Sequence, residues 1–354
     1  MGKTNFGNDG AAPQKKTLFT YTFSDAQIEK LREICLEKSD FEATQVQYSS
    51  FSGRLKARGV VVTVYPKRNR VVISGGGAAE FVEFEIEPKI LFADGVPGLF
   101  AGAENFSSVP KSGGATGNFD DATAAAAIPE KYLERHAGLD ESGKGDLFGV
   151  PVAACVIVGG DVLRRWVAAG VKDCKAISSD KKIAELAAMI RAEPEAIVRS
   201  ASTRDYNASY ARYGNLDLLL TALHFRALQS ALDAARETSA GAPAHGLLDQ
   251  FSREPHVQHA LEAAGIDFDL EMRPHGEDDP VVAAASIVAR AEFLANLNAL
   301  SERAGMALPK GCGRDAKAAA VKIFKKFGEA RAAEFIKIHF KTAAEAAEIA
   351  ASEP

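Results

Sequence analysis

The stretch from Gly138 to Val158 reads GLDESGKGDLFGVPVAACVIV. Its second half, VPVAACVIV, is a continuous apolar run, which is typical of a central strand buried on both faces. Ahead of that run stand two adjacent carboxylates, Asp140 and Glu141, and the turn Gly143-Lys144-Gly145. Charges at the mouth of a buried strand are costly to desolvate unless a structural partner, a phosphate or a metal ion compensates them. The stretch therefore predicts a sheet-based domain that carries a polar site at one strand end.

Strand-like and helix-like segments alternate on either side of this stretch. We expect further strands at 196–203 and 244–251 and helices at 179–193, 214–237 and 280–300, which predicts an α/β domain around a mixed central sheet. Nearer the N-terminus the pattern differs and predicts a small α+β domain with one antiparallel sheet. Its helices are expected at 24–38 and 78–87, and its strands at 17–23, 46–53, 60–66 and 70–76.

These patterns divide the 354 residues into four segments. We expect a loose tail over 1–16, an N-terminal domain over 17–92, a linker over 93–135 and a C-terminal domain over 136–354. The linker is assigned because its residues are rich in Gly, Ala, Ser and Asp and show no sustained period.

The composition bounds the class of protein. A content of 47% hydrophobic and 25% charged residues excludes a fully disordered chain. No apolar run approaches the ~20 residues needed to cross a bilayer, and the first residues lack the apolar core of a secretory signal. The four cysteines form no CxxC pair, which argues against structural zinc and favours reduced thiols. We therefore expect a cytoplasmic monomer with no membrane partner.

The charge is unevenly distributed along the chain. A net charge of −5 weighs against nucleic-acid binding, because phosphate contacts come from Lys and Arg. Residues 43–79, however, contain no acid and interleave the aromatic residues Tyr48, Phe51 and Tyr65 with basic ones: Arg54, Lys56, Arg58, Lys67, Arg68 and Arg70. Such interleaving is typical of a surface that stacks bases and binds phosphates, although a merely solvated face is the alternative.

Two more acidic positions follow the opening pair. Asp249 ends the expected strand at 244–251, and strand ends are where sites collect in open α/β sheets. A run of three acids precedes Pro280, and the last of them, Asp279, has the position of a helix N-cap. Glu277, displaced from the cap, is then the better candidate for chemistry.

Asp140, Glu141, Asp249 and Glu277 together predict a site whose ligands are all oxygen atoms. Such a set favours Mg²⁺ or Mn²⁺ over zinc, and two ions could clamp the attacking and leaving oxygens of a phosphodiester. Scattered surface acids are the alternative. The glycines after Glu141 match neither a Walker loop nor GxGxxG, because Gly149 stands one position late, so a nucleotide-binding loop is disfavoured.

Six motifs occur in the order found in type 2 ribonucleases H, and the chain resembles that family over residues 17–90 and 136–345. They are GLDESGKGDLFGVPV, GVKDCKAISSDKKI, YNASYARYGNLDLLLTAL, LLDQF, VVAAASIVARAEFL and LPKGCG. The chain is more similar to ribonuclease HIII than to ribonuclease HII, because Gly143-Lys144-Gly145 stands where ribonuclease HII usually has Gly-Arg-Gly.

The resemblance implies a ribonuclease H-like catalytic domain, with an N-terminal domain similar to the fold of the TATA-binding protein. It implies endonucleolytic cleavage of RNA in RNA/DNA hybrids, leaving 5′-phosphate and 3′-hydroxyl ends, and a place in DNA replication and repair. Four carboxylates carry over as ligands of two Mg²⁺ or Mn²⁺ ions: Asp140 bridging both, Glu141 and Asp249 at the leaving oxygen, and Glu277 at the attacking water.

The same resemblance implies the residues that contact substrate. The turn Gly143-Lys144-Gly145 is expected to read the ribose 2′-hydroxyl, the group that distinguishes RNA from DNA. Lys175 is expected to contact phosphate, and the N-terminal domain is expected to hold the hybrid through Tyr48, Arg54, Lys56 and Arg58.

The chain departs from the family pattern at two places. The stretch HGEDDPVV is one residue short, which leaves Asp278 as the alternative to Glu277, and Asp173-Cys174-Lys175 replaces the usual Asp-Ser-Lys. Two other functions stay open: a ribonuclease HII-like enzyme that cuts at single ribonucleotides in DNA, and a hybrid-binding protein that does not cut. His224 stands in an apolar helical segment and is expected to be a core histidine.

Overall fold

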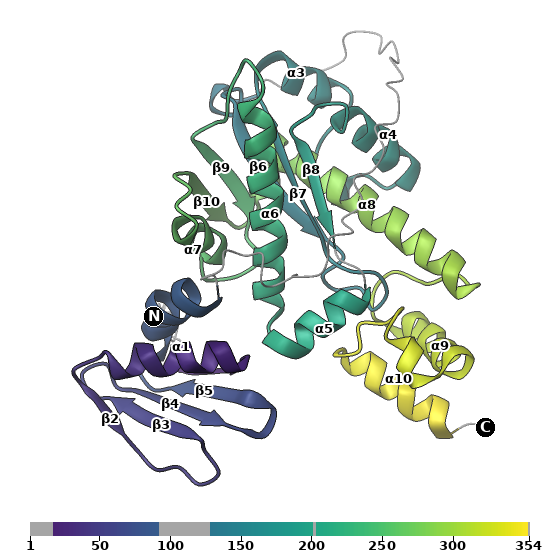
Figure 1. Cartoon of the computed structure of the whole chain (residues 1–354). Coiled ribbons are helices and arrows are strands. Elements are labelled where there is room, and N and C mark those ends of the chain that lie inside the picture. Colours follow the sequence, from purple (N-terminus) through teal and green to yellow (C-terminus); the bar gives the residue numbers. More distant parts are fainter. Residues whose placement is uncertain (1–16, 92–127, 201–202, 353–354) are drawn as a thin grey trace, which may run out of the picture. The chain divides into compact units, whose positions relative to one another are not determined.

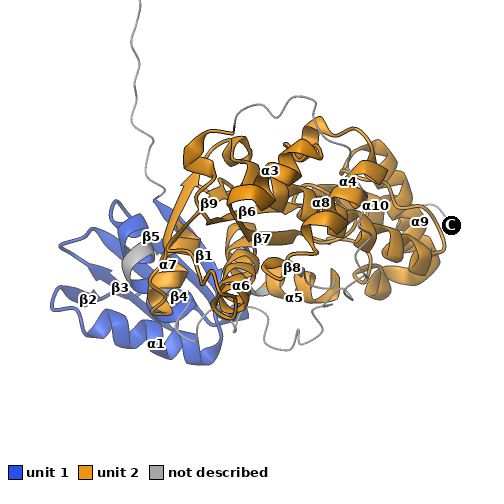
Figure 2. Cartoon of the chain, turned by 90° about the horizontal axis from the view of Figure 1, so that it is seen from above, with its two compact units in different colours: residues 1–93, 212–214 blue, residues 94–211, 215–354 orange. Residues whose placement is uncertain are grey.

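The computed structural model describes residues 17–91, 128–200 and 203–352. The tail expected at 1–16 and residues 93–127 of the expected linker lie outside the described residues. The chain divides into two compact units (Figure 2), with residues 1–93 and 212–214 in unit 1 and residues 94–211 and 215–354 in unit 2.

Unit 1 contains the predicted antiparallel sheet, which has five strands in the order β1-β5-β4-β3-β2; the edge strand β2 was not predicted. Its strands are β1 (Leu18–Thr22), β2 (Phe41–Ala43), β3 (Phe51–Leu55), β4 (Val60–Tyr65) and β5 (Arg70–Ser74). Helix α1 (Asp25–Leu36) begins with a capping box between Ser24 and Gln27, and α2 (Ala78–Phe81) continues into a π-helix, Val82–Leu91. A 3₁₀ turn, Lys67–Asn69, joins β4 to β5.

The two faces of this sheet differ. Val60, Val62 and Val64 are fully buried on the face covered by α1 (Figure 1). Because side chains alternate along a strand and register partners share a face, the opposite, open face carries Arg54, Tyr65 and Arg70 among other residues.

The strand expected at 46–53 begins later than predicted. Tyr48 has a φ of 65°, and the Ser49 N–H donates to the Val46 carbonyl at 3.1 Å. These residues form a tight turn, which a left-handed residue allows and a strand does not, so β3 starts only at Phe51.

Unit 2 is built on a mixed sheet in the order β10-β9-β6-β7-β8, which confirms the predicted fold class. Strands β10, β9 and β6 run parallel, and β7 and β8 are antiparallel to their neighbours. The strands are β6 (His136–Ser142), β7 (Val152–Val158), β8 (Ala196–Ser200), β9 (His245–Asp249) and β10 (Asp269–Arg273). The strand expected at 196–203 is shorter than predicted, because Thr203 already belongs to a helix.

Two long helices, α6 and α8, cover opposite faces of this sheet (Figure 1). The helices of unit 2 are α3 (Gly160–Ala168), α4 (Asp180–Ile190), α5 (Thr203–Tyr213), α6 (Leu216–Arg236), α7 (His256–Ala263), α8 (Pro280–Ala304), α9 (Arg314–Ala332) and α10 (Lys341–Ser352). Short 3₁₀ turns occupy Glu130–Tyr132, Cys174–Ala176 and Gly276–Asp278.

Helix α8 is the core helix of unit 2. Asp279 caps it by accepting from the Val281 N–H at 2.8 Å, and Pro280 occupies its first turn, which confirms the predicted cap. The helix is long and apolar enough to cross a membrane, but 67% of that window is buried inside the protein, as expected of a core helix. It packs so closely on β6 that a Cβ at Gly138 would lie 2.5 Å from the α8 backbone.

Candidate active site

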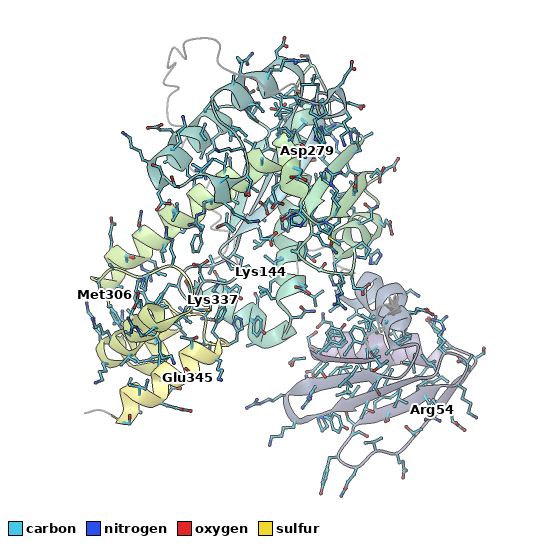
Figure 3. All side chains as sticks on the ribbon, turned by 180° about the vertical axis from the view of Figure 1, so that it is seen from behind. Arg54, Lys144, Asp279, Met306, Lys337 and Glu345 are labelled. Atoms are coloured by element: carbon cyan, nitrogen blue, oxygen red, sulfur yellow. The ribbon has the colours of Figure 1, made fainter. Side chains whose placement is uncertain are left out.

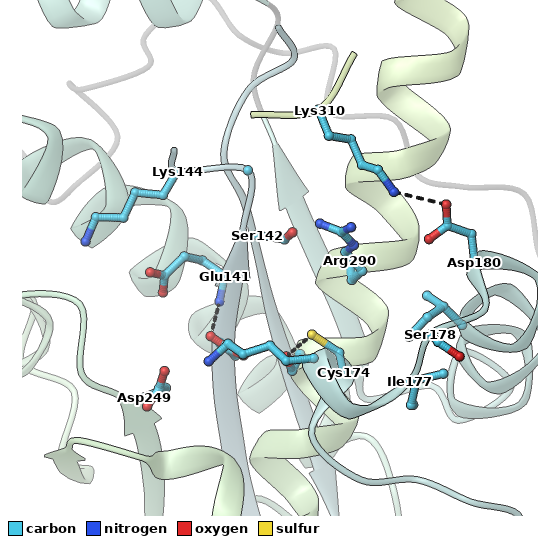
Figure 4. Close-up of a pocket in the computed structure, with 15 residues that line it drawn as sticks. Glu141, Ser142, Lys144, Cys174, Ile177, Ser178, Asp180, Asp249, Arg290 and Lys310 are labelled. Atoms are coloured by element: carbon cyan, nitrogen blue, oxygen red, sulfur yellow. Dashed lines mark hydrogen bonds and ion pairs between the residues drawn. The ribbon is translucent and has the colours of Figure 1, made fainter. Parts of the chain in front are cut away.

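Asp140 and Glu141 stand near the end of β6 and point to opposite faces of the sheet. Asp140 pairs in register with Ala154 and Glu141 with Ala153, and successive residues of a strand face opposite sides. Asp140 therefore faces α8 and lies beside Ser286, whereas Glu141 faces α6, where His224 Nε2 lies 3.1 Å from its Oε2. Because β6 ends at Ser142, both carboxylates still line one pocket. Figure 4 shows Glu141 in this pocket.

Asp249 reaches the same pocket from the neighbouring strand. Leu139 of β6 is in register with Leu248 of β9, so one residue further along Asp249 follows beside Asp140. The Gly276 N–H donates to Asp249 Oδ1 at 2.8 Å. A Cβ at Gly276 would lie only 2.9 Å from the Asp249 Cα, so only glycine permits this approach of the 3₁₀ turn.

The same turn decides between the two neighbouring acids that follow Gly276. Glu277 Oε1 accepts a hydrogen bond from Lys175 Nζ at 3.1 Å, and its side chain is 12% exposed. The other oxygen, Oε2, is buried and has no hydrogen-bond partner among the described residues. Asp278 is exposed. The structure therefore brings Glu277, and not Asp278, to the side of Asp249.

The crowding of these carboxylates shifts their protonation. Burial raises the pKa of Asp140 to about 8, and the neighbouring Glu141 and Asp249 charges add to that effect. Burial also raises the pKa of Asp249, with Glu277 contributing. Burial acts in the same direction on Glu277, but hydrogen bonds from its own backbone and from Lys175 outweigh it and leave that pKa below its usual value.

Positively charged side chains line the same pocket. Lys144, Lys175, Arg290 and Lys310 all contribute to its wall. Lys310 Nζ lies 3.2 Å from Asp180 Oδ2, and the Lys175 side chain is 72% exposed at the mouth. Carboxylates and cations therefore share the lining of one pocket, and these are the groups that bind metal ions and phosphates in proteins.

The two glycines of the turn after β6 differ in their surroundings. Gly143 has a φ of +87°, and a Cβ there would lie 2.4 Å from the Phe293 ring. A Cβ at Gly145 would meet nothing within 4 Å in the part of the chain that the structure describes, so its backbone is open to a ligand. Lys144 Nζ donates to the Phe251 carbonyl at 2.9 Å, which directs its charge toward the segment after β9.

Cys174, which replaces the serine usual in the family, also lines the pocket. The Ser286 hydroxyl donates to Cys174 Sγ at 3.0 Å. Burial raises the pKa of the thiol, so it is protonated near neutral pH. The sulfur thus serves as a hydrogen-bond acceptor that helps to orient Ser286 beside Asp140.

Of the residues expected to bind substrate in unit 1, some are exposed and others are held in ion pairs. Tyr48 is 81% exposed, and Arg54 is exposed on the open face of the sheet. Lys56 forms an ion pair with Glu42 at 3.1 Å, and Arg58 lies 3.6 Å from Glu85. The acid-free window at 43–79 is therefore partly neutralised by acids that stand just outside it in the sequence.

Three further site residues were not predicted to belong to the site. His224 is fully buried and stacks on Phe251, as expected of a core histidine, but its Nε2 contacts Glu141. Ser286 and Arg290 reach the pocket from α8. Their four-residue spacing, which places them on one face of a helix, was the signal available in the sequence.

The carboxylates are engaged with protein partners in this arrangement. Glu141 faces His224, and Glu277 faces Lys175. Within the described ranges, no three or more His, Cys, Asp or Glu side chains form a group placed to hold a metal ion.

A mixed five-stranded sheet, with acids at the ends of β6 and β9 and cations in the same pocket, is the arrangement that the resemblance to the ribonuclease H class implies. The family model described as Ribonuclease HII matches residues 137–343. Two curated relatives are both Ribonuclease HIII. The protein from Chlamydia pneumoniae is 32% identical and aligns over 92% of this chain and 96% of its own; that from Protochlamydia amoebophila is 33% identical over 87% and 89%.

Solved structures share the fold. A mutant of Bst-RNase HIII aligns with a TM-score of 0.58 and 24% identity, covering 95% of this chain and all of that one. Bst-RNase HIII in complex with Mn²⁺ aligns with a TM-score of 0.57 and 24% identity, covering 94% and 99%. The chain belongs to the ribonuclease HIII family, which places it among the ribonuclease H hydrolases.

Proposed function

We propose that the protein cuts the RNA strand of RNA/DNA hybrids at internal phosphodiesters, leaving 5′-phosphate and 3′-hydroxyl ends. The observation that carries the proposal is the convergence of Asp140 and Asp249, from adjacent parallel strands, on one pocket with a basic rim. The ribonuclease HIII family of the chain supports the hybrid as its substrate.

The residues on the floor of the pocket suit a hard divalent cation. A carboxyl whose pKa burial raises to about 8, beside two further acids, is stabilised as an anion only when positive charge comes close. Glu277 does not itself line the pocket, but it stands beside Asp249, and its Oε2, buried and without a partner among the described residues, offers a further oxygen ligand. We infer that Asp140, Glu141, Asp249 and Glu277 hold two Mg²⁺ or Mn²⁺ ions, and the Mn²⁺ complex of Bst-RNase HIII supports this choice.

Bound divalent cations would neutralise the scissile phosphate and activate water for attack. The protein's own side chains prepare the rest of the site. Lys175, Arg290 and Lys310 on the rim bind phosphates that flank the cut. His224 orients Glu141, so that this carboxylate faces the pocket in a fixed position, and Ser286 lies beside Asp140.

The turn Gly143-Lys144-Gly145 is proposed to recognise the ribose. Backbone N–H groups can donate to a 2′-hydroxyl oxygen, and deoxyribose has no such atom. The open space beside Gly145 allows a sugar to approach the backbone closely. In unit 1, the exposed Tyr48 and the open-face Arg54 are proposed to hold the duplex by stacking and by phosphate contact.

The direct test is cleavage of a labelled RNA/DNA hybrid with Mg²⁺ by the wild type and by Asp249→Asn. The variant keeps the size of the side chain and an oxygen that can accept from Gly276, but loses the negative charge. We expect its kcat/KM to fall by more than about 100-fold, since even indirect partners of metal ligands are worth 10- to 100-fold. Equal cutting by both proteins would overturn the metal assignment.

The match to the Ribonuclease HII model favours one alternative activity, which is incision at a single ribonucleotide in duplex DNA. A duplex with one embedded ribonucleotide, assayed beside the all-RNA hybrid, separates the two activities. Preference for the single ribonucleotide would favour the alternative. Tight binding of the hybrid without any cleavage, with either metal, would instead identify a hybrid-binding protein that does not cut.

A further inference from the structure

Lys337 is a fully buried lysine in the segment between α9 and α10. Its Nζ donates to the Gly143 carbonyl at 2.7 Å and approaches the Lys144 carbonyl at 3.4 Å. Figure 3 shows Lys337 beside Lys144, although the two residues are 193 positions apart in the chain. A side chain from the C-terminal segment therefore reaches the carbonyl side of the turn that follows β6.

The backbone around Lys337 is held from two directions. Its N–H donates to the Leu147 carbonyl at 3.1 Å, and Ile336 forms an antiparallel bridge with Phe148. Asn207 of α5 donates to the Ile336 carbonyl at 2.8 Å and accepts from the Ile338 N–H at 3.2 Å. Because these hydrogen bonds hold Ile336 and Ile338, the Cα of Lys337 between them has a fixed position relative to the turn that its side chain contacts.

Burying the ammonium group of Lys337 destabilises the folded protein. Taking a charge out of water costs free energy that an apolar side chain of similar size would not cost. The Tyr206 and Phe340 rings, 5.4 Å and 5.1 Å from Nζ, offset part of this cost through cation–π attraction. The pKa of Lys337 nevertheless falls to about 7 because of its burial. The hydrogen bonds to two backbone carbonyls are what this buried ammonium provides and an apolar side chain could not.

The rigid geometry of the peptide bond shows what those hydrogen bonds can do. The Gly143 carbonyl and the Lys144 N–H belong to one planar trans peptide and point in opposite directions. The same holds for the Lys144 carbonyl and the Gly145 N–H. A donor that holds both carbonyls from the inside therefore turns both N–H groups outward, and the space beside Gly145 is open.

We propose that Lys337 is a positioning residue that holds the carbonyls of Gly143 and Lys144 and thereby aims the N–H groups of this turn at the 2′-hydroxyl of the substrate. The proposal rests on the proposed function, since it needs a ribose at this turn. Lys337 itself touches no substrate. Its effect is on the preference for a 2′-hydroxyl and not on the carboxylate chemistry.

The test compares Lys337→Met with the wild type in the full-length protein. The substrate is an RNA/DNA hybrid, and the competitor is the same hybrid with 2′-fluorine in place of every 2′-hydroxyl of the RNA strand. Fluorine is a much poorer hydrogen-bond acceptor, so the ratio of the inhibition constant to KM measures the preference for the hydroxyl. We expect Lys337→Met to lower this ratio about 3- to 10-fold, which corresponds to one ordinary hydrogen bond.

A matched control is available in the same unit. Lys326 Nζ also donates to a backbone carbonyl, that of Ala304, at 2.8 Å, but at the far end of α8 from Asp279. Lys326→Met should leave the ratio unchanged. A lower cleavage rate in Lys337→Met with an unchanged ratio would overturn the proposal, because a merely structural lysine would affect both duplexes alike.

A second variant covers the case in which Lys337→Met does not fold. Lys337→Gln keeps an N–H donor on a shorter side chain and should lower the ratio less than Lys337→Met does. If neither variant folds, Lys337 is a folding residue and the proposal is wrong. Failure of the wild type to cut the hybrid at all would instead refute the proposed function, and that outcome is visible before any variant is made.

Discussion

Glu277 and Asp278 are adjacent in the sequence but differ in surroundings. Glu277 contacts Lys175 and leaves one oxygen buried without a partner among the described residues, whereas Asp278 is exposed. We therefore expect Glu277→Gln to lower kcat/KM on the hybrid by more than about 100-fold and Asp278→Asn to change it less than about 2-fold. Steady-state kinetics with Mg²⁺ measure both. A severe loss in Asp278→Asn alone would move the fourth ligand to that residue.

The choice between these two acids could not be made from the sequence. His275 has a φ of 57°, and a single turn of 3₁₀ helix follows it. A left-handed residue before one turn has no periodicity that tells which side chain faces inward. Asp279, by contrast, could be predicted as a cap, because a carboxylate before a first-turn proline has one common geometry.

His224 illustrates a role that burial alone conceals. Its ring is fully buried, but its Nε2 lies 3.1 Å from Glu141 Oε2, so the histidine orients a carboxylate of the site. We expect His224→Phe to lower kcat/KM by about 10- to 100-fold, with His224→Gln retaining more activity because its amide can still donate. Thermal unfolding of both variants serves as the control. Equal kinetics for the phenylalanine and glutamine variants would argue against a hydrogen-bonded role.

At the level of secondary structure, several elements with a clear pattern were predicted, whereas seven others that the structure describes were not: β2, β10, α3, α5, α7, α9 and α10. The apolar run of β7 and the amphipathic spacing of α4 and α6 indicated their type directly. Strand β10, with the sequence DLEMR, is only five residues long and has its three charged residues on one face and Leu270 and Met272 on the other, and β2 has three residues. Such elements form because β9 and β3 offer them hydrogen-bonding edges, which is a tertiary effect.

The strand β6 carries two acids toward two different helices, and this could only be anticipated in part. Alternation along a strand predicts that Asp140 and Glu141 diverge. Which helix each meets depends on the placement of α8 and α6 over the sheet. The acids of the site could therefore be identified from the sequence. Their neighbours Ser286 and His224 could be identified only from the folded structure.

The segment around Lys337 allows a prediction about pH and stability. Burial lowers the pKa of this lysine from 10.5 to about 7, against the opposing attraction of Asp146 and Cys312. Below pH 7 the ammonium is charged in the folded and the unfolded state, and the cost of burial is present in full. Between about pH 7 and 10.5 only the unfolded state stays protonated, so folding releases a proton and stability rises with pH.

The measurement is urea unfolding of the wild type and Lys337→Met at pH 7, 8 and 9. The stability of the wild type relative to the variant should rise by up to ~1.4 kcal/mol per pH unit over this range. Two neighbours, His339 and Tyr206, act as a constant background, since the pKa of His339 is lowered to about 4 and that of Tyr206 is raised well above this range. A difference that does not change with pH would mean that Lys337 titrates normally.

At the scale of the whole molecule, the net charge of −5 conceals a local surface. The open face of the unit 1 sheet carries Arg54 and Arg70, while Lys56 and Arg58 are engaged with Glu42 and Glu85. Residues 43–79 contain six basic residues and no acid, which predicted an uninterrupted basic surface. Folding brought acids from outside the window onto two of them, which a count along the chain cannot show.

This distribution predicts which charges of unit 1 matter for binding. We expect the double variant Arg54→Gln, Arg70→Gln to bind an RNA/DNA hybrid more weakly and to reduce the slope of log Kd against log salt by about 2, one for each lost phosphate contact. Fluorescence anisotropy between low and physiological salt, in Ca²⁺ to limit cutting, gives both quantities. The cause is the loss of counterion release at two phosphates, so the weakening should be independent of the sequence of the hybrid.

The control for this experiment is Lys30→Gln. Lys30 lies on α1, which covers the other face of the sheet, and it already pairs with Glu33 at 3.0 Å. Its loss changes the net charge of unit 1 by one but should leave the salt slope unchanged. If the control lowers the slope as much per charge as the double variant does, binding depends on the overall charge of unit 1, and the open face of its sheet is not a docking surface for the hybrid.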